Sequence, residues 1–412
     1  MKQRPGLRVA AILIGVLAGC LILELFSTAW LGLENGGYVS AKALFDRTPN
    51  SFLGAGTRNS GCTAADSLFP HPYVAFVHHG DPPCGSNNTN NVGLYGPDFP
   101  RQKLTDRYVV LLTGGSVAAF VGQSYAKSPR FLEEALNRRY VSPSGKPFLV
   151  LTGAEGGWKE PQQFLLFSLY APLVDAVVSL DGYNEYILFG PAQKLALDAP
   201  NSQFVAANPL FRGDFSDLAM GWTIARVAQT ISDSALLNRS HAAYLLYRSL
   251  MDQAQRWDIM QYDRKVRMDT MFGLPNDVLG NGDKIFSDQL RRYQNYKIST
   301  AAVASAHGVK AAHFLAPIPS WGKTLSDYEK AHIGDPSYLG RYRELVGEMM
   351  KLRERGLEMF DLGDVFKDET GTIYDDHIHC QFAPDGSNRG YQLMAARMAE
   401  NLATAWGLKP KP

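Results

Sequence analysis

Five short apolar runs constrain the fold of this chain more than any other feature of its sequence. They cover residues 108–112, 148–151, 176–180, 309–315 and 359–362. Helical patterns, such as those at 162–170 and 342–355, separate them. Short apolar runs bounded by turn residues are typical of strands buried on both faces, and strands that alternate with helices form βαβ units. The sequence therefore predicts an α/β fold, a three-layer α/β/α sandwich around a mainly parallel five-stranded sheet.

Residues 190–288 interrupt this alternation. They contain no buried-strand pattern, and their clearest periodic stretches, 217–231 and 240–257, are helical. We expect a helical insertion or lid on the sheet rather than a separate domain. Its aromatic residues would serve in helix packing, which we favour, or in stacking on sugars; they are Trp222, Tyr244, Tyr247, Trp257 and Tyr262.

An apolar segment near the N-terminus predicts a membrane anchor. Three basic residues precede residues 9–33, where Glu24 is the only charge. A helix of this length spans about 35 Å, enough for a bilayer core of roughly 30 Å. The positive-inside rule then makes residues 1–8 a cytoplasmic tail and 9–33 a transmembrane signal anchor. Residues 34–100 would be an extracytoplasmic lead-in, and 101–410 the main domain.

Two alternatives to the signal anchor remain open. The motif Leu17-Ala18-Gly19-Cys20 resembles a bacterial lipobox, in which Cys20 would carry the lipid, and ordinary cleavage is the other alternative. All three interpretations place the main domain outside the cytoplasm.

Charge and cysteine usage narrow the classes of partner. Lys and Arg number 41 against 40 Asp and Glu, a balance that argues against a nucleic-acid binder. In an oxidising compartment we expect a disulfide between Cys62 and Cys84, which flank a polar segment, with two unpaired cysteines as the alternative. The sequence contains no Cys/His spacing typical of zinc, and we expect neither a metal nor a cofactor.

Glycine-containing motifs follow the first three predicted strands. They are Thr113-Gly114-Gly115-Ser116-Val117, Gly153-Ala154-Glu155-Gly156-Gly157-Trp158 and Asp181-Gly182-Tyr183-Asn184-Glu185. Ligand sites in open α/β sheets form at the carboxyl ends of the strands. A serine at a helix N-terminus has a free backbone N–H, and an Asn carboxamide offers a neutral donor to a developing oxyanion. Each motif alone is more typical of an ordinary turn.

A fourth motif lies near the C-terminus, in the loop Tyr374-Asp375-Asp376-His377-Ile378-His379-Cys380. An Asp and a His three residues apart can hydrogen-bond, and the carboxylate then fixes the imidazole tautomer and leaves Nε2 as a base.

Together the four motifs resemble the sequence blocks of the SGNH (GDSL-like) hydrolase family. The resemblance covers residues 108–379. It extends upstream to His71-Pro72-Tyr73 and residues 91–96, which look like the lead-in of membrane-anchored bacterial members. It implies an SGNH/flavodoxin-like fold. Two residues depart from the family pattern, because Gly115 and Glu185 both stand where Asp is common.

The resemblance also implies roles for individual residues. Ser116 would be the nucleophile, His379 the general base and Asp376 the residue that orients it. The oxyanion hole would combine the N–H of Ser116, the N–H of Gly157 and the side chain of Asn184. Gly156 is an alternative to Gly157, and Asp375 and His377 compete for the roles in the last motif.

These residues predict an extracytoplasmic serine ester hydrolase that acts through an acyl-Ser116 intermediate on esters, such as O-acylated carbohydrate of the cell envelope. One alternative is an O-acyltransferase that modifies envelope polysaccharide or peptidoglycan. Another is a non-catalytic envelope assembly or glycan-binding protein. In each case the N-terminal helix would hold the chain as a single-pass protein of the bacterial inner membrane, with the main domain on the periplasmic side.

Overall fold

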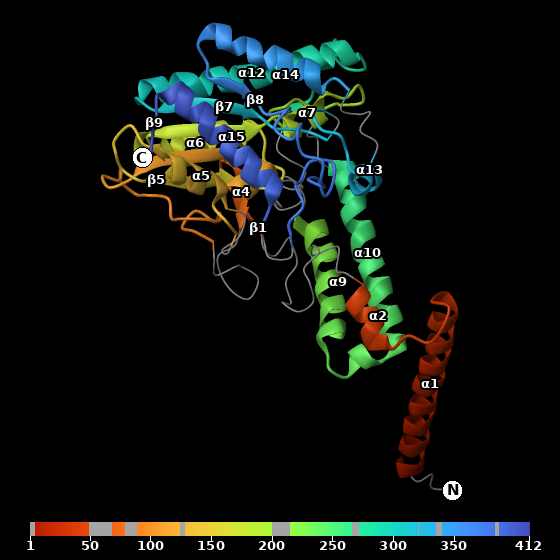
Figure 1. The fold of residues 1–412 in the computed structure, drawn as a ribbon. Helices are drawn as coiled ribbons and strands as arrows, with labels where there is room; N and C mark the ends of the chain where they lie inside the picture. Colours follow the sequence, from red (N-terminus) through yellow and green to blue (C-terminus); the bar gives the residue numbers. More distant parts are fainter. Residues whose placement is uncertain are drawn as a thin grey trace. The chain divides into compact units, whose positions relative to one another are not determined.

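The chain divides into two compact units (Figure 1). A computed structural model describes residues 5–48, 68–78, 89–123, 128–199, 215–265, 272–319, 321–334, 340–383 and 387–412. One unit comprises Met1–Ser67 and Val205–Val266, and the other comprises Leu68–Phe204 and Arg267–Pro412. Cys62 and Cys84, and with them the expected disulfide, lie outside the described residues.

The larger unit is built on a parallel five-stranded sheet. Its strands are β3 (Tyr108–Gly114), β5 (Phe148–Ala154), β6 (Ala176–Asp181), β7 (Lys310–Leu315) and β8 (Met359–Asp361). They lie in the order β5-β3-β6-β7-β8, and every neighbouring pair is parallel. The α/β class and the five predicted strands are confirmed. Numbered along the chain, the order is 2-1-3-4-5, so the direction of winding reverses between β3 and β6.

Two groups of helices pack around this sheet. One consists of α4 (Ser116–Gly122), α5 (Phe131–Arg139) and α15 (Arg389–Trp406), which contact one another and, through α4 and α5, strand β5. The other consists of α6 (Gln162–Tyr170), α12 (Gly282–Ala306) and α14 (Tyr342–Met350). α15 illustrates how the sequence forms these helices. Asn388 caps its first turn, and its apolar residues recur every three or four positions, which gives one buried face.

Shorter elements complete the larger unit. Helix α7 (Tyr183–Tyr186) follows β6, and α13 (Asp327–His332) precedes α14. The 3₁₀ turns are η2 (Ala171–Leu173), η3 (Ile187–Phe189) and η7 (Lys351–Arg355). Two small antiparallel pairs were not predicted from the sequence: β1 (Leu68–His71) with β2 (Ala75–His78), and β4 (Tyr140–Val141) with β9 (Lys409–Pro410).

The smaller unit is helical. It contains α1 (Pro5–Glu34), α2 (Ala41–Arg47), α9 (Phe215–Asp233), η5 (Leu237–Arg239) and α10 (His241–Lys265). Tyr244 and Tyr247 pack against Phe45 in its core, so they are packing residues rather than a sugar platform. The side chains of Trp257 and Tyr262 lie outside the described part of the structure. Trp222 is exposed, and Arg226 stacks on its ring.

This grouping differs from the predicted domain boundaries. The long helices within 190–288 belong with the N-terminal segment and not with the sheet, whereas part of the expected lead-in, from Leu68 onward, belongs with the sheet. The physical reason is a set of contacts between α1 and α10, in which Glu24 accepts hydrogen bonds from the first residues of α10. Helical periodicity indicated α10 but not the surface on which it packs.

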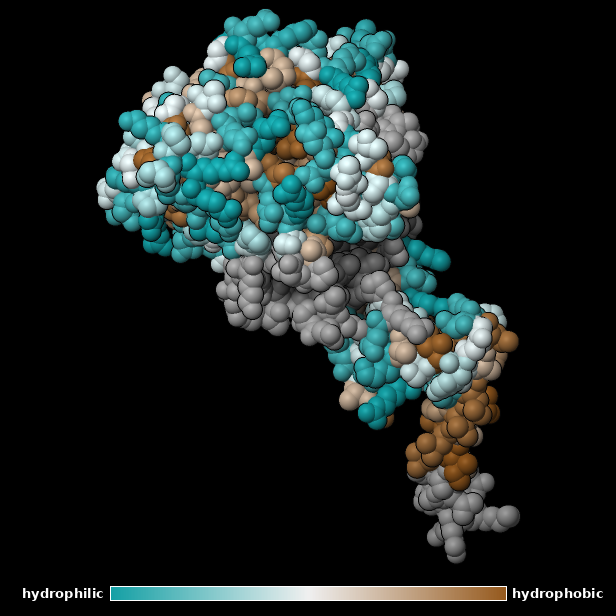
Figure 2. Space-filling view, viewed as in Figure 1, coloured by the Kyte–Doolittle hydropathy of each residue, from teal (hydrophilic) through white to brown (hydrophobic). Residues whose placement is uncertain are grey.

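Helix α1 is long and apolar enough to cross a membrane. Within Ala11–Glu34, an 18-residue window has a mean hydropathy of 2.2, and only 6% of that window is buried. Figure 2 shows hydrophobic side chains along most of the helix.

Candidate active site

Ser116 is the first residue of α4, directly after β3. The turn between strand and helix is tightly packed. A Cβ atom at Gly114 would lie 2.2 Å from the carbonyl oxygen of Leu180 and 2.5 Å from the Cβ of Ala118. Glycine therefore lets β3 continue beside β6 until the chain turns, and the serine emerges at the carboxyl end of the sheet.

His379 lies between Ser116 and Asp376. Its Nε2 is 2.7 Å from Ser116 Oγ, and its Nδ1 is 2.7 Å from Asp376 Oδ2. An ionised Asp376 accepts a hydrogen bond from Nδ1–H, which leaves Nε2 to accept a hydrogen bond from the hydroxyl of Ser116. The ring of Phe120 packs edge-on against the imidazole, with 5.7 Å between ring centroids. Three predicted site residues thus form one hydrogen-bonded chain, in which Ser116 is 263 positions from His379 in the sequence.

Asp376 also holds the loop that carries the histidine. Its Oδ1 accepts the backbone N–H of Ile378 at 2.8 Å and that of His379 at 2.7 Å. Partial burial alone would raise the pKa of Asp376, but the hydrogen bonds from the His379 side chain and these two N–H groups hold it well below its usual value. One carboxylate therefore fixes both the loop and the ring.

The competing residues of this loop have other contacts. The ring of His377 lies beside Tyr183, with 5.7 Å between centroids. Asp375 accepts the hydroxyl of Tyr328 at 2.9 Å, and its backbone N–H donates to the carbonyl of His379. The two candidate pairs are Asp376 with His379 and Asp375 with His377. Only in the first pair does the structure show a contact between the histidine and Ser116.

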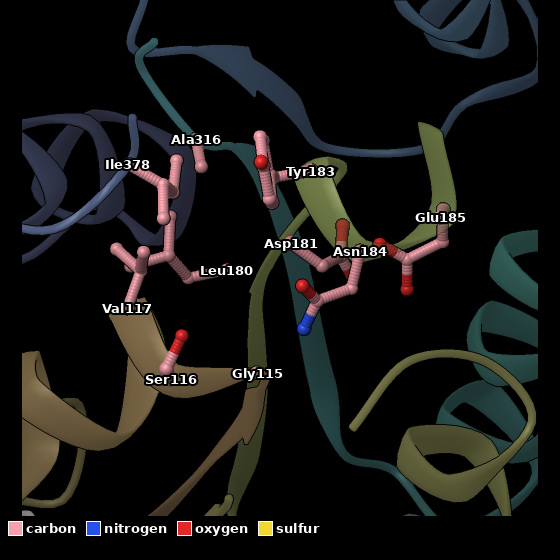
Figure 3. A pocket seen from close by; sticks show the side chains of 10 residues that line it. All are labelled: Gly115, Ser116, Val117, Leu180, Asp181, Tyr183, Asn184, Glu185, Ala316 and Ile378. Atoms are coloured by element: carbon pink, nitrogen blue, oxygen red, sulfur yellow. The ribbon is translucent and has the colours of Figure 1, made fainter. Parts of the chain in front are cut away.

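Asn184 reaches the same space from helix α7, which follows β6. Its Nδ2 donates to the carbonyl of Trp158 at 2.8 Å. Gly115 gives this amide its room, because a Cβ there would lie only 2.2 Å from Asn184 Nδ2. Any residue with a Cβ at position 115 would therefore crowd this amide. In Figure 3 the hydroxyl of Ser116 and the amide of Asn184 lie on either side of Gly115.

The glycine loop after β5 is held by hydrogen bonds of Glu155. Gly156 donates its N–H to Glu155 Oε1 at 2.7 Å, and Glu155 Oε2 lies 2.7 Å from His78 Nε2 on strand β2. Gly157 has φ +76°, a conformation that favours glycine. Glu155 thus engages the N–H of Gly156, the alternative donor of this loop, and the role of Gly157 stays a prediction of the sequence motif.

A small pocket opens beside Ser116. It encloses about 270 Å³ of space, including part that is open to solvent, and is lined by Gly115, Ser116, Val117, Leu180, Asp181, Tyr183, Asn184, Glu185, Ala316 and Ile378. Apolar side chains and potential donors thus surround one cavity, an arrangement suited to a small ester or acyl group.

Sequence reasoning missed a buried ionic cluster behind this pocket. Lys297 of α12 is 1% exposed, contacts Asp181 and lies 2.8 Å from Glu160 Oε1. Burial opposes the charge of Lys297, but its pKa is raised because Asp181 and Glu160 stabilise the ammonium form. The cluster joins residues from distant segments, and a lysine in a helical pattern is normally an exposed residue.

Glu185 is a second feature that sequence reasoning did not interpret. Its carboxylate accepts the N–H of Gly182 at 2.9 Å, the N–H of Glu160 at 3.0 Å and the side-chain amide of Gln163 at 3.0 Å. Burial raises the pKa of Glu185 to about 8, repulsion from Asp181 adds to the rise, and Lys297 opposes it. This side chain ties the turn that carries Asn184 to the segment that follows the glycine loop.

Among the described residues, no group of three or more His, Cys, Asp or Glu side chains is arranged to hold a metal ion. No protein-family model matches the chain, and no curated protein matches it either. The geometry and the sequence motifs therefore carry the functional argument on their own.

Proposed function

We propose that this protein is a serine ester hydrolase of the SGNH type. One observation carries the proposal: Asp376, His379 and Ser116 form a continuous chain of hydrogen bonds. The chain lies where β3 and β6 end, on either side of the point at which the winding of the sheet reverses, the usual place for a ligand in such folds. The two groups of helices support the three-layer sandwich that the family resemblance implies.

In the first half of the reaction Ser116 Oγ attacks the ester carbonyl while His379 Nε2 takes the hydroxyl proton. Asp376 stabilises the imidazolium ion that results. The tetrahedral oxyanion would receive hydrogen bonds from Asn184 Nδ2 and from the N–H groups of Ser116 and Gly157. When the intermediate collapses, the bond to the alcohol breaks, His379 returns the proton to the leaving oxygen, and acyl-Ser116 remains.

In the second half a water molecule attacks the acyl-enzyme. His379 accepts a proton from this water, a second tetrahedral intermediate forms in the same oxyanion hole, and its collapse releases the carboxylic acid and regenerates the Ser116 hydroxyl. If a sugar hydroxyl replaced the water, the same residues would catalyse acyl transfer. A glycan acceptor added together with a model ester separates the two activities, because a transferase forms the acylated glycan at the expense of the free acid.

We further propose that α1 anchors the protein in the inner membrane and that the larger unit lies on the periplasmic side. The basic residues before the apolar stretch support this orientation. O-acylated carbohydrate of the envelope is the substrate class within reach of an enzyme in that location.

A fluorophosphonate probe tests the proposal directly, because it modifies only an activated serine. Full-length protein in detergent should be labelled, Ser116→Ala should abolish the labelling, and Ser168→Ala should leave it unchanged. Ser168 is a suitable control because its hydroxyl is engaged by the backbone of α6. Labelling that persists in Ser116→Ala would refute the assignment of the nucleophile, and a wild-type protein that is never labelled would favour the non-catalytic binding protein.

A further inference from the structure

A carboxylate of the apolar helix α1 serves as the cap of another helix. Glu24 accepts the hydroxyl of Ser240 at 2.5 Å, the N–H of His241 at 2.7 Å and the N–H of Ala242 at 3.2 Å. The first N–H groups of a helix have no partner within the helix, and its dipole favours a negative charge at that end. The carboxylate of Glu24 therefore has hydrogen-bond donors as partners, and these partners hold the start of α10 against α1.

Further contacts show that α1 and α10 run in the same direction. Thr28 Oγ1 lies 3.1 Å from His241 Nδ1, and Arg248 donates to both carboxylate oxygens of Glu34 at 2.8 and 3.0 Å. The N-terminal end of α10 is thus level with Glu24, and the helix continues toward the end of α1. Ser240, the last residue of the turn between α9 and α10, contacts α1 through Glu24, whereas η5 in the same turn packs on α2, α9 and α10.

The apolar length of α1 sets the depth of this turn. A hydrocarbon core of about 30 Å takes roughly 20 helical residues. Counted from Val9, the first residue after the basic flank, these end near Thr28. Glu24 then lies about 6 Å inside the outer boundary. The Arg248–Glu34 ion pair lies about 15 Å farther along α1 than Glu24, outside the hydrocarbon.

The turn presents two exposed leucines among polar residues. Leu236 is 80% exposed and Leu237 is 41% exposed. Arg239 and Asp233, the charged neighbours of these leucines, can avoid the hydrocarbon. Arg239 is long enough to reach the headgroups, and Asp233 accepts a hydrogen bond from Gln229, which lies one turn earlier in α9. On α1, Leu25 and Phe26 are also exposed.

We propose that the turn around Leu236 and Leu237, called here the hairpin tip, inserts into the outer leaflet of the bilayer that α1 spans. The partner is the lipid acyl region, and the depth of about 6 Å matches that of interfacial apolar segments. The bilayer then holds the smaller unit at two places, which restricts its tilt. This inference rests on the proposed membrane anchor, but not on the proposed esterase activity.

Photo-crosslinking in lipid vesicles tests the proposal. Full-length protein is reconstituted in vesicles of phosphatidylcholine and phosphatidylglycerol, with p-benzoyl-phenylalanine replacing one residue at a time, and phospholipid adducts are detected by mass. Leu17, which is exposed on α1, is the positive control. Asp252, an exposed residue 11 positions after His241 and so about 16 Å beyond it along α10, is the negative control.

We expect adducts at positions 17 and 236 and none at position 252. An adduct at 17 without one at 236 overturns the insertion of the hairpin tip and keeps the anchor. Adducts at neither position overturn both. An adduct at 252 as well as 236 also overturns the proposal, because α10 would then lie along the membrane. Fluorophosphonate labelling of the same vesicles reports on Ser116 separately.

Discussion

Replacing Gly115 by alanine probes the oxyanion hole without removing any of its donors. The new Cβ would lie 2.2 Å from Asn184 Nδ2, and such contacts are essentially never closer than 3.0 Å. The amide must therefore retreat by at least 0.8 Å, the difference between these two distances. The backbone tolerates the change, because Gly115 has φ −90°.

A displacement of about 1 Å at a catalytic group costs roughly 10²-fold in rate. We therefore expect kcat for a p-nitrophenyl ester to fall about 10²-fold, or about 2.7 kcal/mol of transition-state stabilisation, with a much smaller effect on KM. Gly347→Ala is the matched control, since nothing lies within 4 Å of the added atom. Its kcat should equal that of the wild type.

A double-mutant cycle tests whether Asn184 transmits the effect. Asn184→Ala alone should lower kcat by about 10²–10³-fold. Because the clash is with the Asn184 side chain, adding Gly115→Ala to that variant should cost little more. Effects that multiply, or a single Gly115→Ala variant with nearly normal kcat, would refute the proposed role of Asn184.

Three further predictions concern the site and the cluster behind it. Lys297→Met should lower the free energy of unfolding in urea by about 3–5 kcal/mol, because it leaves buried carboxylates unpaired; a loss under about 1 kcal/mol would contradict the ionic cluster. Asp376→Asn should lower kcat by about 10⁴-fold, measured by ester hydrolysis, while the fold remains intact by circular dichroism; a nearly normal rate would remove Asp376 from the mechanism. Because burial raises the pKa of Glu185 from 4.5 to about 8, the folded chain keeps a proton that the unfolded chain loses. The free energy of unfolding should therefore fall as the pH rises through this window, and Glu185→Gln should reduce the slope; an identical slope in that variant would show that Glu185 does not titrate there.

The sheet and the residues of the hydrogen-bonded chain at Ser116 were predictable because local patterns mark them. Each strand is an apolar run, and the motifs occur where those runs end. The predicted carboxyl ends of two strands, at residues 112 and 151, were nevertheless too early. Strand β3 continues through Gly114, and β5 continues through Ala154. Glycine looks like a turn residue in a sequence, but here Gly114 pairs with Ala154 on one side and Leu180 on the other. Pairing with neighbouring strands overrides the local preference.

The remaining features depend on which distant segments meet. The positive charge of Lys297 predicts an exposed position until Asp181 and Glu160 are known to surround it. Strand β1 contains Pro70, which argues against a strand unless the strand lies at an edge, and β1 pairs only with β2 among the described strands. The periodicity of α9 and α10 indicated helices but not that α1 is the surface on which α10 packs.

The pairing of Glu24 with Ser240 has a consequence for biosynthesis. The two residues are 216 positions apart in the chain. A ribosome that adds about 5–20 residues per second needs roughly 11–43 s to synthesise that stretch. In a membrane-anchored chain, α1 would enter the bilayer during this interval, before the amides that later solvate its carboxylate exist. The insertion machinery would then handle a more polar segment than the finished protein contains, and the hydrogen bonds of Glu24 would form only after α10 is translated.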